Sequence, residues 1–360
     1  MGGGASDLTA DSYVPVLAAE AAASRRFAFR GRDPQDVAAW QSAFRPHLRR
    51  LLGIDRIAAR GTCALEPRCV GEADAGDHVR EEWTIQSEPG FRLPFFLLRP
   101  REGVPAGGRP LVITPHGHGR AGKRTYAGLW STEEERREIE GGQRDVALQA
   151  VRAGCVAIAP DMRGFAGLRR HEERERDAVS SCRTLQMHAL LFGRTLVGER
   201  VWDVGRLIDY AATRPEVDPS RIAVTGNSGG GTVALFAAAC DERVALAIPG
   251  SYFCTFAGSI GAIHHCECNY VPGLLADAEM ADVAGLIAPR PFLAVAGRQD
   301  PIFPYPAVLE AFEALRAIYA AAGAAECCAL STGEGGHRYY GADVWPFVRR
   351  WLGAGASGAG

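Results

Sequence analysis

Five residues near the middle of the chain combine a nucleophile with the backbone freedom that a nucleophile needs. The run 226–230 reads Gly-Asn-Ser-Gly-Gly; it follows a predicted strand at 221–225 and precedes a predicted helix that begins near 232. A G-x-S-x-G run in this strand–turn–helix context predicts a sharp, strained turn with the serine at its tip. We therefore predict that Ser228 is a catalytic nucleophile and that the N–H of Gly229, at the start of the helix, is an oxyanion donor.

A glycine-rich turn between a strand and a helix could instead bind phosphate. No Lys-Ser or Lys-Thr pair follows the glycines, so the turn is not a Walker loop. The glycine spacing of a dinucleotide fingerprint is absent as well. The sequence thus favours the nucleophile, and no cofactor is expected.

A serine nucleophile needs a base and a group that orients the base. Downstream, His337 ends a glycine-rich loop after the last predicted strand, and Asp300 follows the apolar run 292–296. The chain order Ser, Asp, His is the order expected when a nucleophile turn of this kind lies on an α/β sheet. We predict that His337 is the base and Asp300 the acid; Glu334 is the rival acid, but it lies too near His337 in the sequence to orient its ring easily.

A second oxyanion donor is expected from the loop after the predicted strand 111–114. That loop reads Pro-His-Gly-His-Gly at 115–119, and the donor is the backbone of Gly117 or of His118. We expect His116 to anchor the loop. The His-x-His spacing could bind zinc, but it would need a further ligand and would leave the serine unexplained.

The irregular segment 254–278 is a candidate wall of the substrate pocket. It contains His264-His265-Cys266-Glu267-Cys268, whose spacing does not match the usual Cys-x₂₋₄-Cys zinc pattern, so no metal site is predicted. The predicted pocket residues are Asn227, Tyr252, His265 and Tyr270.

The remaining chain supplies elements to position these groups. Residues 1–60 read as a helical extension, 61–352 as one catalytic domain and 353–360 as a flexible tail. A hairpin is expected near 79–98, followed by apolar strands that alternate with helices such as 305–321 and 344–352. This alternation predicts an α/β fold with a mainly parallel central sheet flanked by helices. The dense charges at 133–138 and 169–176 indicate solvated helix faces.

Composition excludes several classes of function. The 360 residues carry a formal net charge of −2, so no basic surface for nucleic acid is indicated. No apolar run is long enough to cross a membrane, and no secretory signal is recognisable at the start. The ten cysteines do not form a small disulfide framework, so we expect mostly reduced, buried thiols in a cytoplasmic protein.

Several stretches together resemble a known group, the bacterial α/β-hydrolases of the acetyl-xylan-esterase and dienelactone-hydrolase-like type. They are His-Gly-His-Gly at 116–119, Gly-Glu-Arg-Val-Trp-Asp at 198–203, Arg-Pro-Glu-Val-Asp-Pro at 214–219, His-Cys-Glu-Cys-Asn-Tyr at 265–270 with Pro-Gly at 272–273, and Ile-Ala-Pro-Arg-Pro at 287–291. The resemblance covers about residues 36–352. It implies the α/β-hydrolase fold and a cofactor-free carboxylic-ester hydrolase for small, acetyl-like acyl groups.

Other activities remain open at this point. The same triad serves amidases and peptidases, although a peptidase of this type usually carries a large extra domain for which the chain has no room before Pro110. An acyltransferase would pass the acyl group to another alcohol, and a relative without activity would act as a binding protein. The expected partner is a small-molecule ester, and a homo-oligomer is compatible with the sequence.

Overall fold

The computed structural model describes residues 11–353 and is built around one nine-stranded sheet. The strand order is β1-β2-β3-β5-β4-β6-β7-β8-β9. The first four strands in this order pair antiparallel, and all other neighbours are parallel. The strands are β1 (Arg68–Asp74), β2 (His78–Glu88), β3 (Phe91–Pro100), β4 (Arg109–Ile113), β5 (Val156–Pro160), β6 (Val217–Asn227), β7 (Leu246–Gly250), β8 (Phe292–Gly297) and β9 (Cys328–Gly333).

The central strands are apolar because both faces of the sheet are covered. In β4, Leu111 and Ile113 belong to one hydrophobic cluster, and Val112 between them belongs to the other. Successive side chains of a strand point to opposite faces, so a continuous apolar run suits a strand buried on both sides. The predicted fold class, a mainly parallel sheet flanked by helices, is confirmed.

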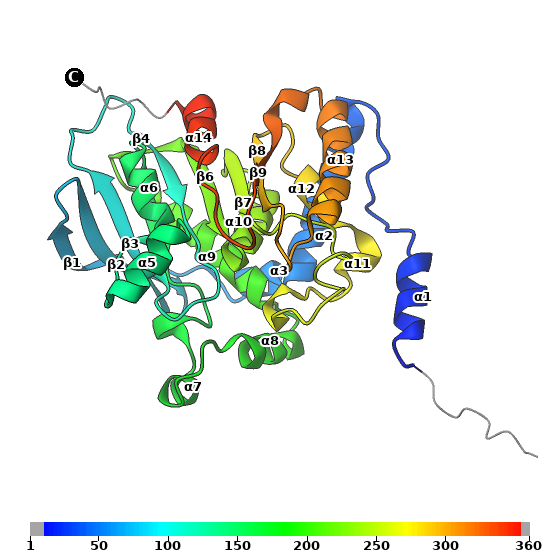
Figure 1. Cartoon of the computed structure of the whole chain (residues 1–360), viewed down its shortest axis with the longest axis horizontal. Coiled ribbons are helices and arrows are strands. Elements are labelled where there is room, and N and C mark those ends of the chain that lie inside the picture. Colours follow the sequence, from blue (N-terminus) through cyan, green and yellow to red (C-terminus); the bar gives the residue numbers. More distant parts are fainter. Residues whose placement is uncertain (1–10, 354–360) are drawn as a thin grey trace, which may run out of the picture.

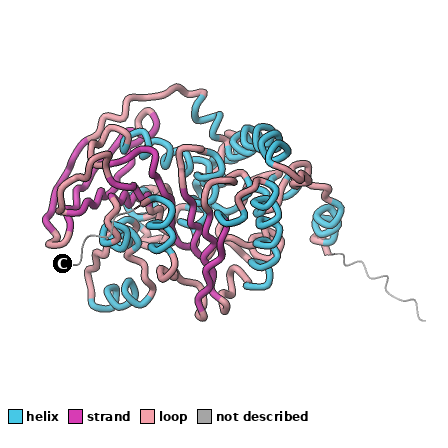
Figure 2. The backbone as a smooth tube through the Cα atoms, turned by 90° about the horizontal axis from the view of Figure 1, so that it is seen from above, coloured by secondary structure: helices cyan, strands magenta, loops and turns pink. Residues whose placement is uncertain are grey.

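Helices form a layer on each face of the sheet (Figures 1 and 2). One layer contains α4 (Lys123–Tyr126), α6 (Val146–Arg152) and α14 (Val344–Leu352). The opposite layer contains α2 (Pro34–Leu52), α3 (Ile54–Ala58), α9 (Leu196–Ala211), α10 (Gly229–Cys240), α12 (Met280–Gly285) and α13 (Tyr305–Ala321). The remaining helices are α1 (Val14–Ala22), α5 (Glu133–Gly141), α7 (His171–Glu175), α8 (Cys182–Leu191) and α11 (Leu274–Asp277).

The N-terminal helices differ in how they contact the rest of the molecule. Helix α2 begins at an Asp33 cap, ends at Gly53 in a left-handed conformation and buries Phe44, Leu48 and Leu52 in the main cluster. Helix α1 buries no residue and lies apart in Figure 1. The expected helical extension is thus in part a component of the main core, while the predicted domain boundary at residue 60 stays a prediction. Residues 1–10 and the predicted tail at 354–360 lie outside the described residues.

Three segments depart from the regular alternation of strands and helices. The 169–176 charges lie on and around α7, which with α8 projects from the lower edge of the molecule in Figure 1. The charged run at 133–138 lies in α5, whose only buried residue is Ile139. Segment 254–278 is irregular, as predicted, apart from a short 3₁₀ turn (Glu267–Asn269) and α11.

Two expectations from the sequence concern the cysteines, which were expected to be reduced, and membrane-spanning segments, of which none was expected. All ten cysteines are free, and the buried ones are Cys155, Cys182, Cys240, Cys254, Cys268 and Cys327. Their redox state in solution stays a prediction. Among the described residues, no helix combines the length and the apolar character needed to span a bilayer.

Candidate active site

Ser228 lies at the tip of a strained turn between β6 and α10. Its backbone φ is 57° and ψ is −119°, a conformation that side-chain-bearing residues rarely adopt. The flanking glycines are required sterically, because a Cβ on Gly226 or Gly230 would lie 2.2 or 2.0 Å from the Pro115 carbonyl oxygen. Since its N–H donates to the Gly250 carbonyl oxygen at 2.8 Å, Ser228 is fixed to β7. The structure therefore has the turn that the sequence predicted.

Tyr126, which the sequence analysis did not select, contacts the turn through its hydroxyl group. The Tyr126 hydroxyl accepts a hydrogen bond from the N–H of Asn227 at 2.9 Å. Burial raises the pKa of Tyr126 to about 12, so the hydroxyl stays protonated at neutral pH. Tyr126 lies in α4, far from the turn in sequence, so only the fold shows this contact.

His337 and Asp300 meet across the loops that follow β9 and β8. The Nδ1 of His337 lies 2.8 Å from Oδ2 of Asp300. The other carboxylate oxygen accepts from the N–H groups of Ile302 and Phe303 at 2.8 and 3.1 Å. Because a carboxylate oxygen accepts hydrogen bonds, Nδ1 is the donor in this contact, which leaves Nε2 as the ring nitrogen that can take a proton from a nucleophile. The Phe303 ring stacks on the imidazole, with ring centroids 5.7 Å apart.

A cavity of about 430 Å³ brings the predicted groups together. Its wall includes Ser228, Gly229 and His337, and Asp300 lies behind His337 with only 5% of its surface exposed. Further residues on the wall are His116, Gly117, His118, Gly119, Tyr126, Arg144, Asn227, Thr232, His264, His265, Cys266, Asn269, Ile302, Phe303 and Arg338. A serine, an oriented imidazole and the first amide of a helix therefore face one solvent-accessible space.

The loop after β4 approaches the serine turn closely. His116 donates from Nδ1 to the Gly117 carbonyl oxygen at 2.7 Å and accepts at Nε2 from the N–H of Met162 at 3.0 Å. Burial lowers the pKa of His116, in keeping with a neutral ring that anchors the loop. A Cβ on Gly117 would lie 2.7 Å from the Asn227 carbonyl oxygen, so this close approach needs glycine. Gly117, His118 and Gly229 all line the cavity.

The four predicted pocket residues divide into two pairs. Asn227 and His265 line the cavity with Ser228, and burial lowers the pKa of His265. Tyr252 and Tyr270 do not line it, which corrects the predicted wall. Tyr252, two residues beyond the end of β7, is 1% exposed and packs edge-on against Phe303. Tyr270 faces a separate apolar cavity of about 120 Å³, and its hydroxyl donates to the Ile260 carbonyl oxygen at 3.1 Å.

Polar groups on the cavity wall are available to a substrate. The Oδ1 of Asn227 is buried and has no hydrogen-bond partner within residues 11–353. The side chains of Arg144 and Arg338 add positive charge to the same wall. Sequence reasoning placed Asn227 in the pocket but did not select either arginine.

Comparisons with known proteins agree with this architecture. A sequence model of the family "Glucuronyl esterase, fungi" matches residues 192–262, a short part of the chain that contains the Ser228 turn. YtaP of Bacillus subtilis strain 168, a presumptive hydrolase, is 26% identical over 321 residues, which are 86% of this chain and 98% of YtaP.

Solved structures show the same arrangement of elements. A presumptive acetyl xylan esterase from Bacteroides fragilis superposes with a TM-score of 0.74 at 18% identity, covering 91% of this chain and 83% of that one. A glucuronoyl esterase from Solibacter usitatus gives 0.63 at 15% identity, covering 89% and 93%. The chain has the α/β-hydrolase fold. The resemblance inferred from the sequence motifs is thereby confirmed at the level of the fold.

In this fold, the Gly-Glu-Arg-Val-Trp-Asp motif at 198–203 belongs to a buried ion network near the site. Arg163, in the loop after β5, contacts Asp203 at 2.7 Å and Glu88 at 2.6 Å. Arg194 contacts the same Glu88 carboxylate at 2.7 Å. The motif therefore joins α9 to the end of β2 and to the loop that carries Met162, the donor to His116.

Proposed function

We propose that this chain is a serine carboxylic-ester hydrolase that acts on small, acetyl-like acyl esters. The observation that carries the proposal is the strained Ser228 at the start of α10, in one cavity with a His337 imidazole that Asp300 holds at 2.8 Å. These are the parts of a Ser-His-Asp triad in the chain order expected for the fold. The esterase and hydrolase names of the relatives support the same reaction class.

In the proposed mechanism, the Ser228 hydroxyl oxygen attacks the ester carbonyl while Nε2 of His337 takes its proton. Asp300 keeps the proton of the ring on Nδ1 and stabilises the imidazolium that forms. The imidazolium then protonates the leaving alcohol, and an acyl-enzyme remains. Water hydrolyses this intermediate by the same route in a second step.

The oxyanion is stabilised by backbone amides in this proposal. The N–H of Gly229 is the first of α10, where helix geometry provides no acceptor. The second donor comes from Gly117 or His118 on the anchored loop. Removing one such donor typically costs about 10²–10³ in rate, so the anchoring by His116 matters for the chemistry.

A second candidate is an ester in which the sugar supplies the acid rather than the alcohol. The family match over 192–262 is to glucuronyl esterases, and Arg144 and Arg338 give the cavity wall the positive charge that suits a uronic acid product. The triad chemistry is identical for both ester orientations, so only the substrate distinguishes them.

The test is hydrolysis of p-nitrophenyl acetate, butyrate and octanoate by the wild type and Ser228→Ala, alongside acetylated xylan and a methyl ester of glucuronic acid. We expect fastest turnover of acetate and a loss of about 10⁴–10⁶ in kcat for the variant. A wild type inert on every ester, or an active variant, would refute the proposal. Preference for the methyl glucuronate would select the second candidate.

A further inference from the structure

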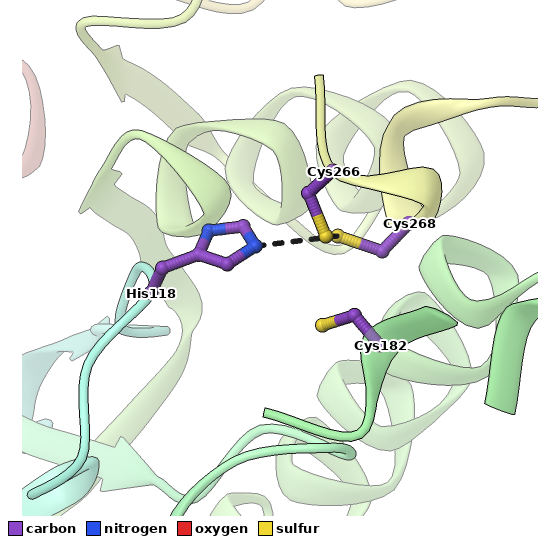
Figure 3. A group of neighbouring side chains, drawn as sticks. All are labelled: His118, Cys182, Cys266 and Cys268. Atoms are coloured by element: carbon purple, nitrogen blue, oxygen red, sulfur yellow. Dashed lines mark hydrogen bonds between the residues drawn. The ribbon is translucent and has the colours of Figure 1, made fainter. Parts of the chain in front are cut away.

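Four side chains with metal-binding atoms converge beside the Ser228 cavity. They are His118 of the loop after β4, Cys182 at the start of α8, and Cys266 and Cys268 of segment 254–278 (Figure 3). All four ligand atoms lie within 4.8 Å of one another. The four residues come from three parts of the chain, around 118, 182 and 266–268, and the outermost two, His118 and Cys268, are separated by 150 positions in the sequence.

The distances between the ligand atoms, from 3.2 Å up to at most 4.8 Å, bracket those of a tetrahedral zinc site. With Zn–S bonds of about 2.3 Å, tetrahedral geometry places sulfur ligands about 3.8 Å apart. The Cys268 sulfur lies 3.8 Å from Nε2 of His118 and 3.2 Å from the Cys266 sulfur. A ligand set of three thiolates and one imidazole, all on the protein, is the pattern of a closed zinc site.

The charge around the cluster points to bound thiolates. Arg200 is only 2% exposed, and within residues 11–353 its guanidinium hydrogen bonds reach no carboxylate. The guanidinium donates to the Arg163 carbonyl oxygen, and its Nη2 lies 3.3 Å from the Cys182 sulfur. Three thiolates and one Zn²⁺ ion carry a net charge of −1. A zinc complex would therefore supply the negative charge that the buried Arg200 guanidinium lacks.

The imidazole is held in place for such a role. The His118 ring packs edge-on against Phe165 with centroids 4.9 Å apart, and Arg200 lies over the same Phe165 ring at 4.8 Å. His118 and Cys266 also line the cavity, which gives a metal ion a route to the cluster. A pre-oriented ligand and an access route are two requirements of a working metal site.

We propose that His118, Cys182, Cys266 and Cys268 bind one Zn²⁺ ion, with release of the thiol protons on binding. With four protein ligands the site is structural: it ties the oxyanion loop to the pocket wall and to α8. Ligation through the His118 side chain leaves the backbone N–H groups of the loop available to a substrate. The sequence favoured no metal because Cys182 and His118 lie far from the Cys-x-Cys pair, and only the fold joins them.

The test measures metal rather than catalysis, so it is independent of the proposed ester hydrolysis. The full chain, purified without a metal-affinity tag, is dialysed and its metal content is determined by mass spectrometry. We expect one zinc per chain. Cys182→Ser and Cys268→Ser should bind zinc at least about 100-fold more weakly, since even the loss of an outer-shell partner costs about 10–100-fold. The matched controls Cys254→Ser (buried) and Cys328→Ser (half-buried) should keep the metal.

A second measurement covers variants that fail to fold. Wild-type protein stripped by a chelator is titrated with Co²⁺, and we expect the visible bands of tetrahedral cobalt with sulfur-to-metal charge transfer. Thiol titration of the unfolded chain, with and without reductant, counts any disulfide between Cys266 and Cys268. Wild type that neither carries zinc nor binds Co²⁺ would overturn the proposal, as would equal zinc in all variants or a Cys266–Cys268 disulfide in the purified protein.

Discussion

At the scale of single residues, close contacts restrict both the backbone around Ser228 and the orientation of the Asp300 carboxylate. The glycines around Ser228 are needed because the Pro115 carbonyl oxygen occupies the space of a Cβ at both positions. The Asp300 carboxylate is fixed by two backbone amides and therefore presents one oxygen to His337. Such contacts explain why the residue types were recognisable in the sequence: close backbone approach demands glycine, and imidazole orientation demands a carboxylate.

The acid of the triad can be tested against its sequence rival. Asn at position 300 can still accept from the amides of Ile302 and Phe303, but it no longer favours the Nδ1–H tautomer of His337. We predict that Asp300→Asn keeps its thermal stability within a few degrees and loses about 10⁴ in kcat. Kinetics on p-nitrophenyl acetate measure the loss.

Glu334→Gln is the matched control, because Glu334 is exposed and pairs with Arg298. It should retain wild-type rates. If Glu334→Gln were inactive and Asp300→Asn active, the assignment of the acid would be reversed.

At the residue scale, the sequence predicted the candidate triad and the oxyanion loop but not the groups that support them. Tyr126 and Cys182 carry no local motif; each becomes relevant only because a distant element is folded against it. Tyr252 and Tyr270 were predicted on the cavity wall, but Tyr252 packs against Phe303 in the core and Tyr270 lines a separate cavity. Sequence spacing therefore identifies functional residues that lie in a local motif, and it misses residues that distant elements bring to the site.

At the scale of elements, buried ion pairs connect the strands to the helix beneath the site. Burial of the Glu88 carboxylate by itself raises its pKa, but the hydrogen bonds and charges of Arg194 and Arg163 outweigh this, and the pKa lies below 4.5. Glu199 in the same network has a pKa raised by burial, which acts in the opposite sense. A comparison of variants is needed to isolate the contribution of Glu88.

Because the pKa of Glu88 is lowered in the folded state, its ionic contacts stabilise the fold fully above pH 4.5 and are lost as the pH falls below that value. We predict that Glu88→Gln lowers the free energy of unfolding by about 1.5–3 kcal/mol at pH 7. The difference from wild type should shrink as the pH falls below 4.5. Urea unfolding at pH 7 and at acid pH measures it.

Glu66→Gln provides the control, since Glu66 is half exposed and its ion pairs contribute little. A Glu88→Gln difference that stays constant or grows at acid pH would contradict the pairing.

Helices and strands with a buried apolar face were predicted from the sequence, whereas the more exposed β1 and α8 were not. The predicted helices 305–321 and 344–352 agree with α13 and α14 because their apolar faces pack on the sheet. Strand β1 was missed because it is an edge strand with almost every side chain exposed, so it has no apolar alternation. Helix α8 was not predicted because its apolar pattern is weak; it contacts the irregular 254–278 segment and α9.

At the scale of the whole molecule, the two N-terminal helices α1 and α2 contribute to the core to very different extents. Helix α1 buries no residue, whereas α2 places Phe44, Leu48 and Leu52 fully inside the main core. The fold class was predictable from the alternation of strands and helices alone. The place of α2 was not, because an amphipathic helix does not reveal which surface it will cover.

This contrast predicts different outcomes for two truncations. Removal of residues 1–22 should leave the thermal midpoint and the activity nearly unchanged. Removal of residues 1–60 should expose the cluster around Phe44 and give aggregated or unfolded protein, since burying one such ring contributes about 3–5 kcal/mol. Scanning calorimetry and gel filtration distinguish the two. A stable, monodisperse product without residues 1–60 would show that α2 is not part of the core.

The most direct test of the central claim, that Ser228 is a nucleophile activated by His337, is covalent labelling with a fluorophosphonate followed by peptide mass mapping. We predict one adduct per chain, located on Ser228, with labelling slowed by several orders of magnitude in His337→Ala. Absence of an adduct, a label on a different residue, or equal labelling rates in wild type and His337→Ala would contradict the account.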